Sequence, residues 1–151
     1  MELYEGLLTR RSVRSFKPDA VPQEQLERIA EAGLYAASGM GRQATKIVVV
    51  TDRKLRDRLV HMNAAVMGQE GADPFYGAPA VLLVLADKNV PTAVYDGSLV
   101  MGNLMLAAHA LGLGSCWIHR AREEFESEEG KAILRDLGIE GDWEGIGHCV
   151  I

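Results

Sequence analysis

The chain has 151 residues, of which 48% are hydrophobic and 25% are charged, proportions that are ordinary for one globular domain and exclude a mainly disordered protein. The formal net charge of −5 disfavours nucleic acid and anionic membranes as partners of the surface as a whole. Two cysteines are too few for a disulfide framework, and no basic leader precedes an apolar core at the N-terminus, so we predict a cytoplasmic location.

The N-terminal part of the chain predicts two helices separated by a basic turn. Residues 2–9 place leucines on one side of a short helix, and Arg10–Lys17 follow as a turn closed by Pro18. Pro22 suits the first turn of a second helix, because its fixed φ matches helical backbone and its missing N–H is not needed there. The run Ser38–Gly41 then ends that helix and forms a flexible loop.

Strands alternate with helices over the rest of the chain. A continuous apolar run predicts a strand buried on both faces. A long segment rich in glycine and alanine predicts a central helix rather than a membrane span, because it contains Asp96, Asn103 and His109. The predicted strands are 46–51, 80–86, 115–119 and 147–151, and the predicted helices between them are 53–67, 94–112 and 128–137. Helices this frequent around few strands indicate a three-layer α/β or α+β domain with both faces of the sheet covered.

The basic turn is the first candidate site. If this segment is extended, Arg10, Ser12 and Arg14 point to the same side, so two guanidinium groups and a hydroxyl converge. Such a set suits a phosphate, which accepts forked hydrogen bonds from arginine. A solvated basic turn and a nucleic-acid patch are the alternatives that the spacing alone leaves open.

The loop Ser38–Gln43 is the second candidate site. Its glycines let the backbone approach a flat ligand, while Ser38 and Gln43 can hydrogen-bond a polar edge. A flexible connection between a helix and a strand is the simpler interpretation. The common nucleotide motifs are absent, because no Gly-x-Gly-x-x-Gly follows a strand and no Walker-type Gly-Lys-Ser/Thr occurs.

The segment Gly112–Arg120 raises the question of a metal site, because it holds Cys116 and His119, and His148 and Cys149 follow later. Residues three apart in a strand face opposite sides, and so do adjacent residues. Strand geometry therefore argues against zinc, and we predict no metal site.

Cys116 could also be a nucleophile if a base were positioned beside it. His119 fails the same test of strand geometry, whereas His61 and His109 stay open as bases. A buried structural thiol is the better interpretation of Cys116. The chain shows no obvious acid pair or serine triad, which fits an enzyme whose cofactor performs the reaction.

Together these segments resemble the flavin-dependent nitroreductase family over nearly the whole chain. The resemblance rests on Arg-Arg-Ser-Val-Arg-Ser-Phe at 10–16, Ala-Ser-Gly-Met-Gly-Arg-Gln at 37–43 and Ala-His-Ala-Leu-Gly-Leu-Gly-Ser-Cys-Trp-Ile at 108–118. It implies an α+β fold, a three-layer α/β/α sandwich with a central mixed, mainly antiparallel sheet. It further implies a single domain over residues 1–151 and a homodimer that holds FMN in two clefts at the subunit interface.

The resemblance also implies how the flavin is held. Arg10 and Ser12 would bind the FMN phosphate with Arg11 supporting them, and Arg14 would lie nearer the ribityl chain and the pyrimidine. A cation there favours reduction, because reduced flavin tends to carry negative charge at that end.

The remaining implied contacts come from a loop of the partner subunit, from the third strand and from one amide. They are Ser38, Gly39, Met40, Gly41 and Gln43 from the partner, Trp117, Ile118, His119 and Arg120 at the other flavin edge, and Asn63 at the ring. Phe75, Tyr76 and Trp117 are candidate pocket walls, with plain core packing as the alternative.

The activity that the resemblance implies is that of an NAD(P)H-dependent flavin oxidoreductase. Hydride would pass to FMN and then to a nitroaromatic, a quinone or a related small acceptor in a ping-pong mechanism, without a catalytic side chain. A non-catalytic flavin-binding or storage protein is the alternative, followed by an anion-binding module. Neither nucleic acid nor a membrane is an expected partner.

Two departures from the family pattern affect these expectations. In the partner loop, Ala37, Gly41 and Ala44 replace prolines and an asparagine that many relatives have. Relatives also continue past the last strand into an arm that crosses to the partner subunit and adds basic phosphate ligands. We expect this chain to lack that arm, because it ends at Ile151.

Overall fold

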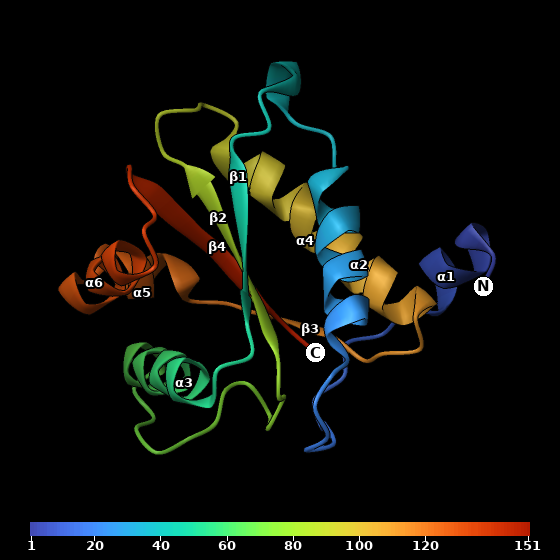
Figure 1. Cartoon of the computed structure of the whole chain (residues 1–151), viewed down its shortest axis with the longest axis horizontal. Helices are drawn as coiled ribbons and strands as arrows, with labels where there is room; N and C mark the ends of the chain where they lie inside the picture. The colour runs from blue at the N-terminus through green and yellow to red at the C-terminus, as the bar shows by residue number, and fades with distance from the viewer.

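The structure, a computed structural model, describes every residue from Met1 to Ile151. Helices and strands alternate after two N-terminal helices (Figure 1). In chain order the elements are α1 (Leu3–Thr9), α2 (Gln23–Leu34), the 3₁₀ turn η1 (Gly39–Gly41), β1 (Thr45–Val50), α3 (Arg53–Met67), β2 (Val81–Asp87), α4 (Ala93–Ala110), β3 (Cys116–Ile118), α5 (Ala121–Glu126), α6 (Glu128–Asp136) and β4 (Trp143–Val150). No helix combines the length and the hydropathy that a membrane span requires.

The four strands form one sheet in the order β1-β2-β4-β3, and every neighbouring pair is antiparallel. The one parallel contact is an isolated bridge between Ser12 and Ser115. Strand β2 lies between β1 and β4, and both of its faces are buried, as its continuous apolar run predicts. The α+β fold with a mainly antiparallel sheet is confirmed.

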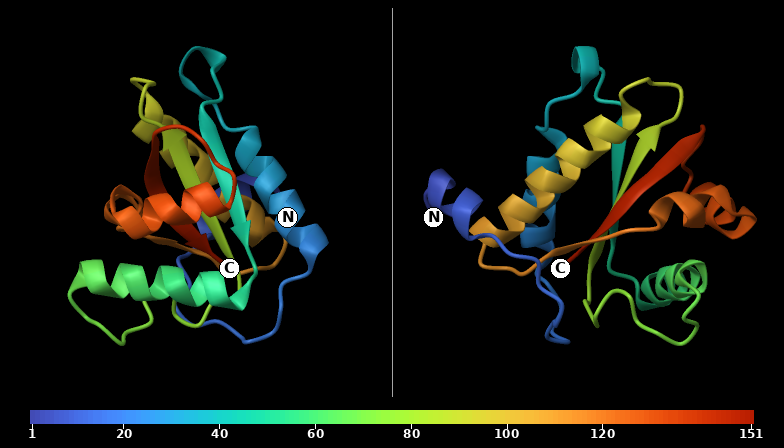
Figure 2. Two further views of the ribbon diagram at one scale, coloured as in Figure 1. Left: turned by 60° about the vertical axis from the view of Figure 1, so that its left-hand side comes forward. Right: turned by 180° about the vertical axis from the view of Figure 1, so that it is seen from behind.

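Alternation along β2 divides the core into two halves. The side chains of Val81, Leu83 and Leu85 pack toward α3, α5 and α6, whereas the residues between them pack toward α2 and α4. All of these positions are almost completely buried. Successive side chains of a strand point to opposite faces, so one short run organises both helical layers. Figure 2 shows the two layers on either side of the sheet.

Most of the predicted elements are confirmed, and α3 has the predicted bounds of 53–67. Its ends follow from local chemistry, because the Asp52 side chain accepts the Leu55 N–H at 2.9 Å and Gly68 ends the helix with a φ of 74°. The Ser127 side chain likewise accepts the Gly130 N–H at the start of α6, as predicted.

Two features near the C-terminus differ from the sequence prediction. Helix α5 was not predicted, because its six residues are mostly charged and carry little apolar periodicity. Strand β4 begins at Trp143, whereas its predicted start is residue 147. The start was predicted too late because Gly145 and Gly147 interrupt the apolar alternation that indicates a strand. Both glycines are needed for close packing: a Cβ at Gly145 would collide with the Ala121 carbonyl of α5, and one at Gly147 would collide with the Trp117 indole.

A buried arginine holds the loop between α3 and β2. Arg56 is 5% exposed, and its guanidinium donates to the Ala78 carbonyl at 3.0 Å and to the carboxylates of Asp57 and Asp73, each at 3.0 Å. Asp73 also accepts the backbone N–H groups of Phe75 and Gly77 at 2.9 Å. One carboxylate therefore fixes both the arginine and the turn that follows it.

Asp73→Ala is expected to lower the free energy of unfolding by about 2–3 kcal/mol, since it removes a charged hydrogen bond and two backbone bonds of the turn. Urea denaturation followed by circular dichroism measures the loss. Asp57→Ala is the matched control, because it removes the ion pairs of a half-exposed carboxylate with Arg53 and Arg56 but no backbone hydrogen bond, and it should cost about 1 kcal/mol or less. Equal losses in the two variants would contradict the anchoring role of Asp73.

Candidate functional site

The basic turn begins where α1 ends. Arg10 is the C-cap residue of α1, and Arg11 Nη1 donates to the carbonyl oxygens of Leu8 at 2.9 Å and of Arg10 at 2.8 Å. Arg11 thus caps α1 and supports the turn. Arg10 Nη1 is buried yet has no hydrogen-bond partner. A buried donor of a charged group is costly without an acceptor, so this position fits an anion that the chain does not itself supply.

The turn continues alongside the start of β3. Ser12 forms the parallel bridge with Ser115, and the Val13 N–H donates to the Ser115 carbonyl at 2.9 Å. The N–H groups of Arg11 and Ser12 donate to no protein atom, and the side chains of Ser12 and Arg14 are exposed. The structure therefore brings the first candidate site next to β3, with free backbone and side-chain donors on the turn.

The loop Ser38–Gln43 is fixed at its base rather than flexible throughout. The Gly39 N–H donates to Asp96 Oδ1 at 2.9 Å, and Thr92 Oγ1 donates to Asp96 Oδ2 at 2.8 Å. The Gln43 N–H donates to Ser38 Oγ at 3.0 Å. Asp96 is 3% exposed, so a buried carboxylate at the start of α4 holds the loop.

The tip of this loop has unusual backbone. Met40, Gly41 and Gln43 all have positive φ, at 55°, 64° and 51°. Met40 is 87% exposed, and the loop extends away from the sheet at the top of Figure 1. Two non-glycine residues held in the left-handed region indicate a specific shape, which the hydrogen bonds at the base maintain.

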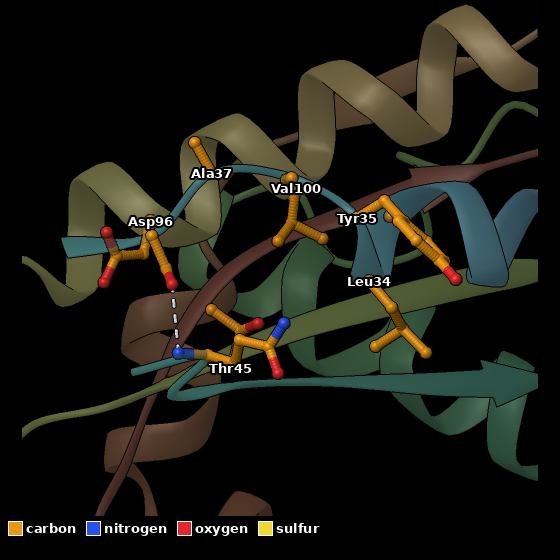
Figure 3. Close-up of a pocket in the computed structure, with 10 residues that line it drawn as sticks. Leu34, Tyr35, Ala37, Thr45, Asp96 and Val100 are labelled. Atoms are coloured by element: carbon orange, nitrogen blue, oxygen red, sulfur yellow. Dashed lines mark hydrogen bonds between the residues drawn. The ribbon is translucent and has the colours of Figure 1, made fainter. Parts of the chain in front are cut away.

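A pocket of about 410 Å³ lies beneath this loop, between the end of α2, the start of β1 and α4 (Figure 3). Its lining includes Tyr35, Ser38, Thr45 and Asp96. Asp96 is the residue here whose importance the sequence reasoning missed, since it served only as an argument against a membrane span. The available signal was the single carboxylate of a largely apolar helix.

The basic turn and the loop lie at opposite ends of α4. Asp96, near the start of the helix, holds the loop, whereas His109 Nε2 lies 2.8 Å from Thr9 Oγ1 at the other end, next to Arg10. Thirteen residues separate Asp96 from His109, which corresponds to roughly 20 Å of helix. One chain therefore does not bring these two candidate sites together.

The end of β3 places its side chains on alternating sides. Ile118 is 4% exposed and packs in the core half formed with α3, α5 and α6, so its side chain is not available to a ligand. Trp117 is half-buried against the other half, and His119 is exposed. Arg120 follows with a φ of 78°. Of the predicted contacts in this strand, Trp117, His119 and Arg120 keep accessible surface.

Two other predicted positions are buried. Asn63 is 0% exposed and its amide bonds to the His119 carbonyl at 2.8 Å and to Arg120 Nε at 2.9 Å, so protein atoms enclose the side chain that was expected to contact a ring. Phe75 is also 0% exposed and packs against His148 with a ring separation of 4.9 Å. Core packing is therefore the correct interpretation of Phe75, whereas Tyr76 is 41% exposed.

The two thiols do not form part of an exposed reactive site. Cys116 and Cys149 are free and buried. Burial raises the pKa of the Cys149 thiol to about 12, with a further rise from Cys116 and an opposing effect of Arg10. Cys149 is therefore a protonated thiol at neutral pH, which excludes it as a nucleophile.

Comparison with known proteins identifies the family. A sequence model of the nitroreductase family matches residues 7–151. The chain belongs to the nitroreductase family. It is 31% identical over 143 residues to a putative NADH dehydrogenase/NAD(P)H nitroreductase of Archaeoglobus fulgidus, a match that covers 91% of this chain and 77% of the relative. A protein of the same description from Methanothermobacter thermautotrophicus is 29% identical over 123 residues, which cover 78% of this chain and 60% of that protein.

A solved nitroreductase with bound FMN from Bacteroides fragilis has the same fold. It superposes with a TM-score of 0.87 at 28% identity, over 99% of this chain and 87% of that one. The nitroreductase fold is thus shared almost in full, although this chain spans only 60% of the length of the Methanothermobacter relative. The resemblance that the arginine turn and the β3 segment indicated is confirmed at the level of the family.

Proposed function

We propose that this protein is an FMN-dependent NAD(P)H oxidoreductase that works as a homodimer. The observation that carries the proposal is the Arg10 guanidinium, whose buried Nη1 lacks an acceptor beside the unpaired N–H groups of Arg11 and Ser12. These donors suit a phosphate monoester, because its oxygens accept hydrogen bonds from several N–H groups and a cation at once. The FMN bound to the similar Bacteroides protein and the NAD(P)H nitroreductase names of the relatives support the same chemistry.

Different residues of the candidate site would bind the phosphate and the ring of the flavin. Arg10 and Ser12 would hold the phosphate while Arg11 keeps the turn in place by capping α1. Trp117, His119 and Arg120 would border the flavin ring, and Arg14 would provide a positive charge near its pyrimidine end. When bound, FMN would supply hydride transfer from NAD(P)H to a nitroaromatic, a quinone or a related small acceptor, in ping-pong order. The side chains bind and orient, and no catalytic side chain is assigned.

The separation of the two halves of the site supports the proposal of a homodimer. Ser38–Gln43 lies roughly 20 Å along α4 from Arg10, so a loop contributed by a second copy of the chain would complete the site around one flavin. Large apolar side chains are also exposed on α1, on the end of α2 and on the outer face of α4, three elements that pack together. They are Leu3, Tyr4, Leu7 and Leu8, then Leu34 and Tyr35, then Val94, Tyr95 and Leu99. Such a surface is typical of a protein interface.

A spectrum and a reduction assay test this function. The purified protein should take up FMN in a titration, and excess NADH or NADPH should bleach the flavin absorbance anaerobically. Re-oxidation by a nitroaromatic or quinone then measures the second half-reaction. No FMN uptake would overturn the proposal, and a flavin that stays oxidised under excess of both nucleotides would favour the storage protein.

A further inference from the structure

A buried polar network connects the centre of the sheet to the end of β3. Asn63 Nδ2 donates to the His119 carbonyl at 2.8 Å and to Glu124 Oε2 at 2.9 Å, and Asn63 Oδ1 accepts from Arg120 Nε at 2.9 Å. Glu124 Oε2 also lies 2.7 Å from His148 Nε2. The side chains of Asn63, Glu124 and His148 are at most 1% exposed. Helices α3 and α5 and strand β4 each contribute one of these three residues.

The network allows a single orientation of the Asn63 amide. Its nitrogen faces a peptide carbonyl and a carboxylate, which accept hydrogen bonds, and its oxygen faces the Arg120 guanidinium, which only donates. A flipped amide would set oxygen against oxygen and N–H against N–H. Asn63 therefore fixes the His119 carbonyl in a direction that points to the protein interior, and it binds the Arg120 side chain at the same time.

The inward carbonyl decides where the next N–H points. In a planar trans peptide the C=O and the following N–H point in opposite directions, so the Arg120 N–H points away from Asn63. This N–H donates to no protein atom. The φ of Arg120 is 78°, in the left-handed region that arginine rarely adopts. A strained residue with an unused backbone donor, held from two sides, is a feature found at ligand-binding sites.

A second layer holds Asn63 in place. Glu124 pairs with His148, and the rings of Phe75 and Phe125 lie 4.9 Å and 6.4 Å from the His148 ring. The pairing leaves Glu124 Oε1 and His148 Nδ1 buried without partners. Buried polar atoms that lack partners destabilise the fold, so this arrangement is not one that stability alone would favour.

We infer that Asn63, supported by Glu124 and His148, is a positioning residue that presents the Arg120 N–H to the bound flavin. This inference rests on the proposed function. An N–H dipole facing the ring stabilises the electron-rich reduced flavin more than the oxidised form, so the network raises the reduction potential. None of the three buried side chains touches the flavin, because each is enclosed by protein.

Hydrogen exchange of the Arg120 N–H tests the inference directly. In the free protein this amide should exchange rapidly, and FMN should slow its exchange at least tenfold, as measured by nuclear magnetic resonance with Arg120→Lys used to assign the signal. Asn63→Ala should remove most of that protection. It should also lower the preference for reduced over oxidised FMN about tenfold, which is about 30 mV in the two-electron midpoint potential.

Controls separate positioning from general stability. Ile133→Ala shortens a core side chain that is 3% exposed and lies outside the network, so it should lower the melting temperature while leaving the Arg120 protection and the potential unchanged. Glu124→Gln keeps an oxygen for Asn63 and should retain most of the protection, whereas Glu124→Leu should lose it. If Asn63→Ala does not fold, the exchange rates of the Arg120 N–H in Glu124→Gln, Glu124→Leu and the wild-type protein still test the positioning role.

Each outcome of these exchange and potential measurements either supports or overturns the positioning role of Asn63. FMN that binds without slowing exchange at Arg120, or an Asn63→Ala protein with unchanged protection and potential, would overturn the positioning role and leave the proposed function intact. Absence of FMN binding by the wild-type protein would overturn both. FMN-dependent protection that is lost in Asn63→Ala and kept in Ile133→Ala would support the inference.

Discussion

Arg10→Ala is expected to weaken FMN binding by about 1.5–3 kcal/mol, the loss that accompanies removal of a charged hydrogen bond. This corresponds to roughly a 10- to 150-fold rise in the dissociation constant. The large effect follows from the buried and unpartnered Nη1 of Arg10, since no other group of the chain accepts its hydrogen. Quenching of flavin fluorescence during titration of the apoprotein measures the constant.

Two further variants distinguish the loss of a positive charge from the loss of the forked donors of Arg10. Arg53 is exposed and pairs only with Asp57, so Arg53→Ala removes the same charge without affecting FMN affinity. Arg10→Lys keeps the charge but loses the forked donors, and its affinity should lie between those of the wild type and Arg10→Ala. An FMN affinity that is unchanged in Arg10→Ala would mean that the phosphate binds elsewhere.

Leu99→Glu is expected to raise the dimer dissociation constant by at least about 100-fold. Leu99 is 51% exposed on α4, within the apolar surface shared with α1 and α2. Burying an unpaired carboxylate in an interface costs about 3–5 kcal/mol, and twofold symmetry introduces the change twice. FMN affinity should fall together with dimerisation, because the Ser38–Gln43 loop would leave the site. Sedimentation velocity over a range of protein concentrations measures the change.

Leu137→Glu is the matched control for the dimer. Leu137 is 44% exposed at the end of α6, on the other side of the sheet from α1 and α4. The same substitution there should leave both dimerisation and FMN affinity unchanged. A Leu99→Glu protein that remains a dimer with full affinity would refute the proposed interface, and the loop would then need another explanation.

The sequence predicted the elements whose chemistry is local. The bounds of α3 follow from the Asp52 cap and Gly68, and the continuous apolar run of β2 indicated a central strand. In α5 and β4 the same reasoning failed, because few apolar residues repeat in α5 and glycines break the alternation of β4. The reason for Gly145 lies in the carbonyl of Ala121, a contact that sequence spacing cannot show.

The candidate site likewise has features that the sequence predicted and features that depend on the fold. The arginine turn and the Ser38–Gln43 loop could be predicted from the sequence, because forked donors and glycines have recognisable chemistry, whereas the flavin contacts of the β3 segment came only from the family resemblance. Only the tertiary structure decided that α4 separates the turn from the loop, and this separation is what supports the proposal of a homodimer. It also showed that Asn63 is a buried side chain that holds Arg120, because its partners at positions 119, 120 and 124, after β3 and in α5, meet it only after folding.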